Sequence, residues 1–213
     1  MIIKNPAKIE ETSMQIIGAE LSEMGITIPE ENRAAVFRAI HASADLDYAT
    51  NLVFTDGAVR AGVEALKKGA AIITDTNMML SGVHKKSLER YGNDAVCYMS
   101  DPVVAAKAKE LDTTRAEVSM ITAAAKYPEG IYAVGNAPTA LLKLADMIED
   151  GMRPSLVVGV PVGFVNIIES KDRALEVCRQ NGVPAIIACG RKGGSSVGAA
   201  ILNALIYEAA GRE

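Results

Sequence analysis

The sequence has no tryptophan and few other aromatic residues. Its 213 residues include three Phe and six Tyr, and 26 acidic side chains outnumber 22 basic ones, so that the formal net charge is −4. Proteins that bind nucleic acids usually carry an excess of basic residues and aromatic side chains on which bases stack. We therefore expect no nucleic-acid partner.

Cysteine is scarce, and long apolar runs are absent. Cys97, Cys178 and Cys189 are widely spaced, odd in number and without a CxxC pair, which is typical of buried thiols in a reducing compartment. No apolar run reaches the ~18 residues that a membrane-spanning helix needs. Residues 1–8 also lack the basic region and apolar segment of a secretory signal. We expect a cytoplasmic protein without disulfides, metal site or membrane segment.

The remaining composition is that of a globular protein, with 49% apolar and 23% charged residues. Short runs rich in Val, Ile and Ala, bounded by Gly, Pro, Asp or Asn, predict five buried strands. These are Ala70–Thr74, Ala95–Ser100, Ile131–Gly135, Leu156–Val160 and Ala185–Cys189. Segments with helical spacing are Gly57–Lys68, Pro102–Leu111, Thr114–Lys126, Pro138–Glu149, Lys171–Gln180 and Ser196–Ala209. The alternation predicts an α/β fold with three layers, α/β/α, around a mainly parallel sheet.

The N-terminal region of about 65 residues reads as wholly helical. Its predicted helices are Pro6–Met24, Pro29–Asp45 and Leu46–Phe54. No linker rich in Ser or Gly separates them from the rest. We expect this region to pack on the sheet, so that residues 1–213 form a single domain.

Ligands of parallel α/β sheets bind beyond the carboxyl ends of the strands, and four junctions there carry unusual residues. In the first, Thr74–Met78, we favour a simple Asp cap on the following helix. In the second, Gly135–Ala140, helix initiation at Pro138 explains most of the pattern, although a helix N-terminus also receives anions.

The other two junctions differ in character. Residues Gly159–Val165 form an apolar loop, and loops are usually polar, so we expect something apolar to cover it. Residues Gly190–Ser196 combine glycines, Arg191, Lys192 and hydroxyls, which makes them the best candidate for binding an anion. Neither GxxxxGK[ST] nor GxGxxG is present, so nucleotide binding is a weak hypothesis.

Imidazole chemistry has two candidates, His41 and His84. His41 shares a helix face with Arg38 and with Asp45, which could orient the imidazole and favour its protonated form. A purely structural His41 is an equal alternative. His84 lies among lysines in a segment that we expect to be an exposed loop. No Cys–His pair or acidic cluster supports covalent or metal chemistry.

Several segments together resemble the precorrin-8X methylmutase family of corrin biosynthesis, from about Ser13 to Leu205. They are IHASADLDYA with NLVF, ITDTNMMLSGV, YGNDAVCYMSDP, YAVGNAPTALLKL, LVVGVPVGFVNIIESK and ACGRKGGSSVGAAILNAL. The resemblance implies an α/β/α homodimer that uses no external cofactor. It also implies one reaction, migration of a methyl group from ring carbon 11 to ring carbon 12, which converts precorrin-8X to hydrogenobyrinate or cobalt-precorrin-8 to cobyrinate. His41–Tyr48 is more similar to the version found in cobalt-dependent pathways.

The resemblance places the role of general acid on His41. A methyl shift needs no nucleophile, but it does need a proton or hydrogen bond on the conjugated ring, and the substrate's carboxylates need binding groups at its rim. The residues expected to bind substrate are Ser13, Arg38, Thr76, Arg115, Asn136, Thr139, Arg191, Lys192, Gly193 and Ser195, with Val160–Phe164 as an apolar wall. Ser13 could instead be only a polar residue of the first helix. The competing hypotheses are a corrinoid carrier without catalysis and a nucleotide-binding α/β enzyme.

Overall fold

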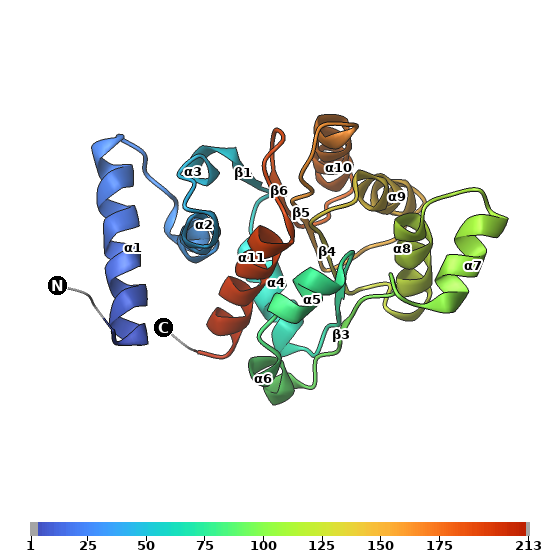
Figure 1. Ribbon diagram of the computed structural model, residues 1–213, viewed down its shortest axis with the longest axis horizontal. Helices are drawn as coiled ribbons and strands as arrows, with labels where there is room; N and C mark the ends of the chain where they lie inside the picture. Colours follow the sequence, from blue (N-terminus) through green and yellow to red (C-terminus); the bar gives the residue numbers. More distant parts are fainter. Residues whose placement is uncertain (1–3, 212–213) are drawn as a thin grey trace.

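The computed structural model describes residues 4–211, in which two layers of helices enclose a six-stranded sheet (Figure 1). The strands are β1 Leu52–Phe54, β2 Ile72–Thr74, β3 Ala95–Val96, β4 Ile131–Val134, β5 Leu156–Gly159 and β6 Ala185–Ala188, in the order β1-β6-β5-β4-β2-β3. All neighbouring pairs are parallel except β1 with β6. The carboxyl ends of β2 to β6 therefore lie along one side of the sheet, here called the carboxyl edge.

The helices fall into two groups, one on each face of the sheet. The first face is covered by α1 Pro6–Glu23, α2 Glu30–Ser43, α3 Tyr48–Asn51, α4 Ala58–Lys67, α5 Asn77–Gly82, α6 Lys85–Leu88 and α11 Ser195–Ala209. The second is covered by α8 Arg115–Lys126, α9 Pro138–Glu149 and α10 Ile167–Gln180, with α7 Pro102–Glu110 packed on α8. Ile131 and Ala133 of β4 face the first layer, whereas Tyr132 and Val134 face the second. Burial on both faces explains why the strands are continuously apolar.

Each of the five predicted runs contains a strand, and the three-layer architecture is confirmed. The prediction that the N-terminal region is wholly helical is wrong, because β1 lies within the predicted helix Leu46–Phe54. Leu52 pairs with Ala188, so the three residues of β1 extend the sheet beyond β6. This pairing supplies hydrogen bonds and burial that local helical preference could not match.

Two predicted helix boundaries also differ from the structure. The second helix ends at Ser43 rather than Asp45, because Ala44 adopts a left-handed conformation with φ of 54°. The helix predicted to begin at Lys171 begins at Ile167, four residues earlier. Both changes lie next to residues of the predicted site.

Candidate functional site

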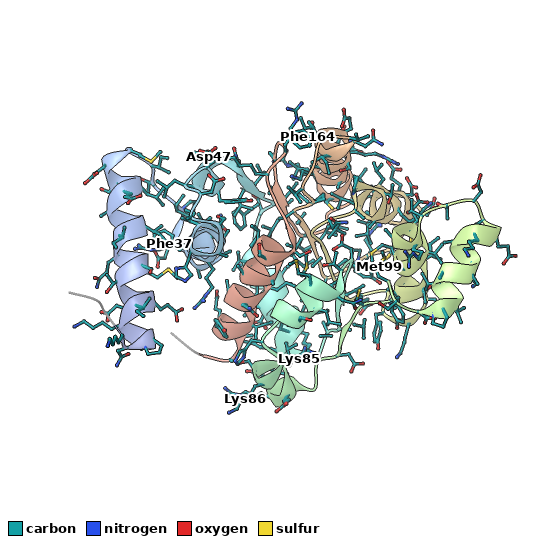
Figure 2. All side chains as sticks on the ribbon, in the orientation of Figure 1. Phe37, Asp47, Lys85, Lys86, Met99 and Phe164 are labelled. Carbon is teal, nitrogen blue, oxygen red and sulfur yellow. The ribbon has the colours of Figure 1, made fainter. Side chains whose placement is uncertain are left out.

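The carboxyl edge brings the four predicted junctions together, because the strands that precede them are parallel. The antiparallel β1 adds its amino end and the segment between α2 and α3 to the same edge. The N–H of Cys189 donates to the carbonyl of Asn51 at 2.8 Å, which joins that segment to the end of β6. Asp47 lies beside α3 and Phe164 beside α10 at this edge (Figure 2).

Asp75, directly after β2, is a fully buried carboxylate. It accepts hydrogen bonds from the N–H groups of Gly135, Asn136 and Ala137, each at 2.8 Å. Burial is the main influence on the Asp75 carboxyl and raises its pKa, while the three donors oppose that rise. Both carboxyl oxygens accept from N–H groups, as an ionised carboxylate does. Its negative charge lies at the segment Gly135–Ala137, here called the α9 loop, which leads into α9.

This arrangement corrects two expectations about the first and second junctions. Asp75 does not cap the helix that follows it, because Thr76 accepts the hydrogen bond from Met79 N–H at the start of α5. The anion received ahead of α9 is the protein's own carboxylate. The part of Asn136 and Thr139 in substrate binding stays a prediction.

Lys171 in the first turns of α10 is also fully buried. Its Nζ donates to the carbonyls of Gly190 and Lys192, both at 2.8 Å. It forms no ion pair within residues 4–211, and burial lowers its pKa to about 8. Lys171 thus anchors the segment Gly190–Gly194, here called the α11 loop, which leads into α11.

Lys192 in the α11 loop binds two carboxylates near the end of α2. Its Nζ lies 2.7 Å from Asp45 Oδ2 and 2.6 Å from Asp47 Oδ2. The pairing raises the pKa of Lys192, and the hydrogen bond to Lys192 lowers that of Asp45. The expectation that Asp45 orients His41 is wrong, because α2 ends before Asp45 and its carboxylate contacts Lys192 instead. The part of Lys192 in substrate binding stays a prediction.

His41 lies in the last turn of α2, and its side chain is exposed. The connection from α2 to Asp45 and Lys192 holds this turn beside the α11 loop. The other histidine, His84, is not in an exposed loop as expected. It is partly buried, with Nδ1 2.9 Å from Ser87 Oγ and its ring 5.3 Å from that of Tyr207. Packing explains His84, whereas His41 is accessible to a ligand.

Three further predicted residues lie at the carboxyl edge. The hydroxyls of Thr76 and Ser195 are 2.7 Å apart, which links the β2 junction to the start of α11. Arg191 is exposed, and its guanidinium carbon lies 5.7 Å from the centre of the Phe164 ring. Phe164 is 85% exposed, as a wall for an apolar ligand requires, but Val160 in the same predicted wall is buried.

Three other predicted residues lie on α1, α2 and α8. Ser13 donates to the Ile9 carbonyl within α1, and Arg38 pairs with Glu10 at 2.6 Å. Arg115 is exposed at the start of α8, where Thr114 and Thr139 hydroxyls lie 3.0 Å apart. Ser13 and Arg115 thus lie on helices that cover opposite faces of the sheet.

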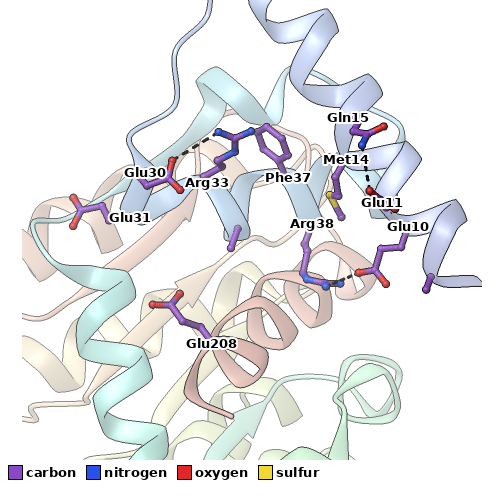
Figure 3. Close-up of a pocket in the computed structure, with 12 residues that line it drawn as sticks. Glu10, Glu11, Met14, Gln15, Glu30, Glu31, Arg33, Phe37, Arg38 and Glu208 are labelled. Atoms are coloured by element: carbon purple, nitrogen blue, oxygen red, sulfur yellow. Dashed lines mark hydrogen bonds and ion pairs between the residues drawn. The ribbon is translucent and has the colours of Figure 1, made fainter. Parts of the chain in front are cut away.

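A cavity of about 1060 Å³ lies away from the carboxyl edge, between α1, α2 and the end of α11 (Figure 3). Five glutamates line it: Glu10, Glu11, Glu30, Glu31 and Glu208. Its cations, Arg33 and Arg38, are each paired with one of them. A lining so rich in carboxylates disfavours an anionic ligand. The carboxyl edge, rather than this cavity, is the better site for a polycarboxylate.

Sequence reasoning missed Asp75 and Lys171 as parts of the site. Asp75 follows an apolar strand, but Lys171 lies in the polar run Glu169–Arg173. Neither stands out as a buried charge, because the partners of both are backbone groups of distant loops. No group of three or more His, Cys, Asp or Glu side chains able to hold a metal is found in residues 4–211. No helix in this range is long and apolar enough to cross a membrane.

Comparison with known proteins shows similarity along nearly the whole chain. The family model for precorrin-8X methylmutase matches residues 8–208. The cobalt-precorrin-8 methylmutase of Priestia megaterium is 41% identical over 94% of this chain and 87% of its own. The precorrin-8X methylmutase of Pseudomonas aeruginosa is 38% identical over 97% of both chains.

A solved structure agrees with this similarity. The precorrin-8X methylmutase of Thermus thermophilus superimposes with a TM-score of 0.87 at 42% identity, covering 96% of this chain and 97% of that one. The similarity thus extends to the arrangement of the strands and helices that form the carboxyl edge. The chain belongs to the precorrin-8X methylmutase family.

Proposed function

We propose that this protein is an isomerase of cobalamin biosynthesis that moves a methyl group from ring carbon 11 to ring carbon 12 of a late corrin precursor. The substrate is cobalt-precorrin-8, which gives cobyrinate, or precorrin-8X, which gives hydrogenobyrinate. No external cofactor takes part, and the whole chain acts as one domain in the cytoplasm. The observation that carries the proposal is the link from Lys192 to Asp45 and Asp47, which holds the accessible His41 beside the α11 loop.

The chemistry of the carboxyl edge suits this substrate. A corrin precursor is an apolar macrocycle with acetate and propionate groups around its rim. The exposed side chains of Val162, Phe164 and Val165 offer an apolar surface, and Arg191 lies beside it. Cations and apolar contacts in one place complement a ligand that is apolar inside and anionic outside.

His41 acts as the general acid in this mechanism. It donates a proton or hydrogen bond to the conjugated ring system, which draws electron density from the carbon that the methyl group leaves. The shift forms no free leaving group and needs no nucleophile. A well-placed general acid is worth about 10²–10⁴-fold in rate.

We further propose that the protein works as a homodimer. Ser13 and Arg115 are family-like polar positions on opposite faces of the sheet, since α1 covers the first face and α8 the second, and a second copy would offer each substrate a further set of such residues. Ile9 and Ile16 of α1 are exposed apolar residues of the kind that a dimer contact would bury. Sedimentation equilibrium of the purified protein tests this directly: a monomer at micromolar concentration would rule it out.

Cobalt-precorrin-8 is the better candidate of the two substrates. The segment His41–Tyr48 resembles the cobalt-dependent version of the family. The Priestia megaterium and Salmonella typhimurium relatives, at 41% and 40% identity, are named cobalt-precorrin-8 methylmutases. Comparing kcat/KM for the two substrates decides between them, with the larger value expected for the cobalt form.

The test of the reaction is turnover by the wild type and by His41→Asn. We expect the variant to lose about 10²–10⁴-fold in turnover while its Kd for product stays unchanged. His84→Asn is the matched control and should keep wild-type turnover. Full activity of His41→Asn would remove the acid role. A wild type that binds corrinoid without converting it would instead establish a carrier, and thermal stabilisation by NAD or ATP alone would favour a nucleotide enzyme.

A further inference from the structure

We infer that Lys171 is a positioning residue for substrate binding: it holds the carbonyls of the α11 loop inward, so that the loop presents backbone N–H groups to a substrate carboxylate. This inference rests on the proposed function, because it assumes that the carboxyl edge binds a corrin polycarboxylate. It concerns a residue that does not contact the substrate. Lys171 is fully buried beneath the loop.

The geometry of two peptide groups sets the direction of the N–H groups in the α11 loop. Lys171 Nζ holds the carbonyls of Gly190 and Lys192, each 2.8 Å away. A trans peptide is planar, so its N–H points opposite to its C=O. The N–H groups of Arg191 and Gly193, which share these two peptides, therefore point away from Lys171.

Other backbone groups of the α11 loop also have hydrogen-bond partners. The carbonyl of Arg191 accepts from Gly163 N–H at 3.3 Å, and Gly194 N–H donates to the Val160 carbonyl at 2.8 Å. Three successive carbonyls of the loop are thus occupied. No acceptor within residues 4–211 is found for the N–H groups of Arg191 and Gly193. The loop is therefore fixed in place, and the N–H groups of Arg191 and Gly193 remain available to a ligand.

Lys171 also brings a positive charge to the α11 loop. Most buried ammonium groups are paired with a carboxylate, since an unpaired buried charge is costly. Lys171 is held by carbonyl oxygens and by no carboxylate among the residues that the structure describes. Asp172, the next residue of α10, acts on this charge through space but forms no ion pair with it. The positive charge is therefore only partly offset, and it polarises the two peptides toward their outward N–H groups. A carboxylate is the ligand that such a loop favours.

Gly193 keeps the loop close to its neighbour. A Cβ atom at this position would collide with the carbonyl oxygen of Val160. The close approach places the α11 loop directly against the start of the apolar loop after β5. A carboxylate on the α11 loop would thus belong to a ligand whose apolar part faces Phe164, which is 85% exposed.

The experiment compares two ligands with three forms of the full-length protein. The ligands are hydrogenobyrinate and hydrogenobyrinate whose side-chain carboxylates have all been converted to primary amides. The proteins are the wild type, Lys171→Met, which keeps the length and apolar character of the side chain, and Arg173→Met. The last variant removes one positive charge from the same helix without touching the α11 loop.

We expect Lys171→Met to bind hydrogenobyrinate about tenfold more weakly or worse, as for the loss of a hydrogen bond to a charged group. Its affinity for the amide form should stay at the wild-type value, and Arg173→Met should match the wild type with both ligands. Equal weakening with both ligands would show that Lys171 only supports the structure. Unchanged binding of hydrogenobyrinate would overturn the inference outright.

A measurement on the wild type keeps the inference testable if Lys171→Met does not fold. Hydrogen exchange of the Arg191 and Gly193 amides should slow when hydrogenobyrinate is added and stay fast with the amide form. If the exchange of these two amides does not change in a protein that binds and converts its substrate, the α11 loop does not bind the carboxylate, while the proposed function stands. A wild type with no affinity for either corrinoid would instead sink the proposed function.

Discussion

The α9 loop and the α11 loop occupy similar places in the fold but are organised by opposite charges. Each follows a parallel strand, contains glycine and leads into a long helix. Under the α9 loop, the buried carboxylate of Asp75 accepts hydrogen bonds from three N–H groups. Under the α11 loop, the buried ammonium of Lys171 donates hydrogen bonds to two carbonyls.

The difference explains which loop can bind an anion. Asp75 uses the donors of the α9 loop and places a negative charge there, so a second anion would meet repulsion and no free N–H groups. Lys171 donates to two carbonyls of the α11 loop, so that backbone N–H groups of this loop remain available beside a positive charge. A glycine-containing helix start is therefore an anion site only when the protein's own carboxylates do not already occupy it.

Removing the charge of Asp75 should have the largest effect on stability. In Asp75→Asn the three N–H groups lose two carboxylate oxygens and face one amide oxygen and an NH₂ group. We expect the free energy of unfolding to fall by about 3 kcal/mol, the upper end of the cost of leaving buried donors unsatisfied. Urea unfolding followed by circular dichroism measures the change. A loss below about 1 kcal/mol would mean that Asp75 does not organise the α9 loop.

Asp75→Ala tests whether the α9 loop binds an external anion once the Asp75 carboxylate is removed. Without the carboxylate, the α9 loop has free donors, and formate can take the place of the side chain. We expect formate to raise the melting temperature of Asp75→Ala in proportion to its concentration, as for any ligand of the native state. The wild type is the control, and its melting temperature should respond to formate no more than to chloride.

Raising the pH should weaken corrinoid binding through Lys171. Burial lowers its pKa to about 8, so its ammonium is lost in a range where the carboxylates of the ligand remain ionised. The Kd of the wild type for hydrogenobyrinate should therefore rise between pH 7.5 and 9.5, while that of Lys171→Met stays flat. Parallel curves for the two proteins would contradict the role of Lys171.

The same shift in pKa has the opposite sign for stability. An unfolded lysine stays protonated up to about pH 10.4, whereas folded Lys171 releases its proton near pH 8. The unfolded state then binds more protons in this interval, so Lys171 makes folding more favourable as the pH rises. Relative to Lys171→Met, the wild type should gain stability from pH 8 to 10, as denaturant unfolding at several pH values would show.

Lys192→Gln should affect turnover more than stability. The ion pairs with Asp45 and Asp47 are exposed and contribute little to folding. They hold the end of α2 beside the α11 loop, so their loss should lower kcat while the melting temperature hardly changes. Lys143→Gln, which removes another partly exposed ion pair, is the control. Equal turnover of both variants would show that the Lys192 link does not position His41.

Arg191→Ala should have the smallest effect. Its guanidinium is exposed beside Phe164, where water screens its charge. We expect the Kd for hydrogenobyrinate to rise a few-fold. The rate at which bound substrate is converted should change less than the Kd. Isothermal titration and single-turnover kinetics separate the two quantities. An unchanged Kd would take Arg191 out of the site.

The sequence predicts much of the sheet, because its parallel strands are buried on both faces and leave continuous apolar runs. It does not reveal β1, a three-residue strand whose partner β6 lies far along the chain. The same applies to the buried charges. Asp75 looks like a cap for the next helix, but its partners begin at Gly135, and backbone partners leave no mark in a sequence.

The helix end near His41 shows the same limit on a smaller scale. The spacing from His41 to Asp45 fits one helix face, but the left-handed Ala44 breaks the helix between them. Asp45 instead forms an ion pair with Lys192, which is distant in the sequence. Local spacing therefore gave Asp45 the wrong partner.

The most direct test follows the backbone amides of both loops in the wild type during titration with hydrogenobyrinate. In ¹H–¹⁵N spectra, hydrogen bonds to a carboxylate move amide protons downfield. We predict such shifts for Arg191 and Gly193 and none of comparable size for Gly135 and Asn136, which already donate to Asp75. Shifts centred on the α9 loop, or on residues of the cavity between α1 and α2, would contradict the account.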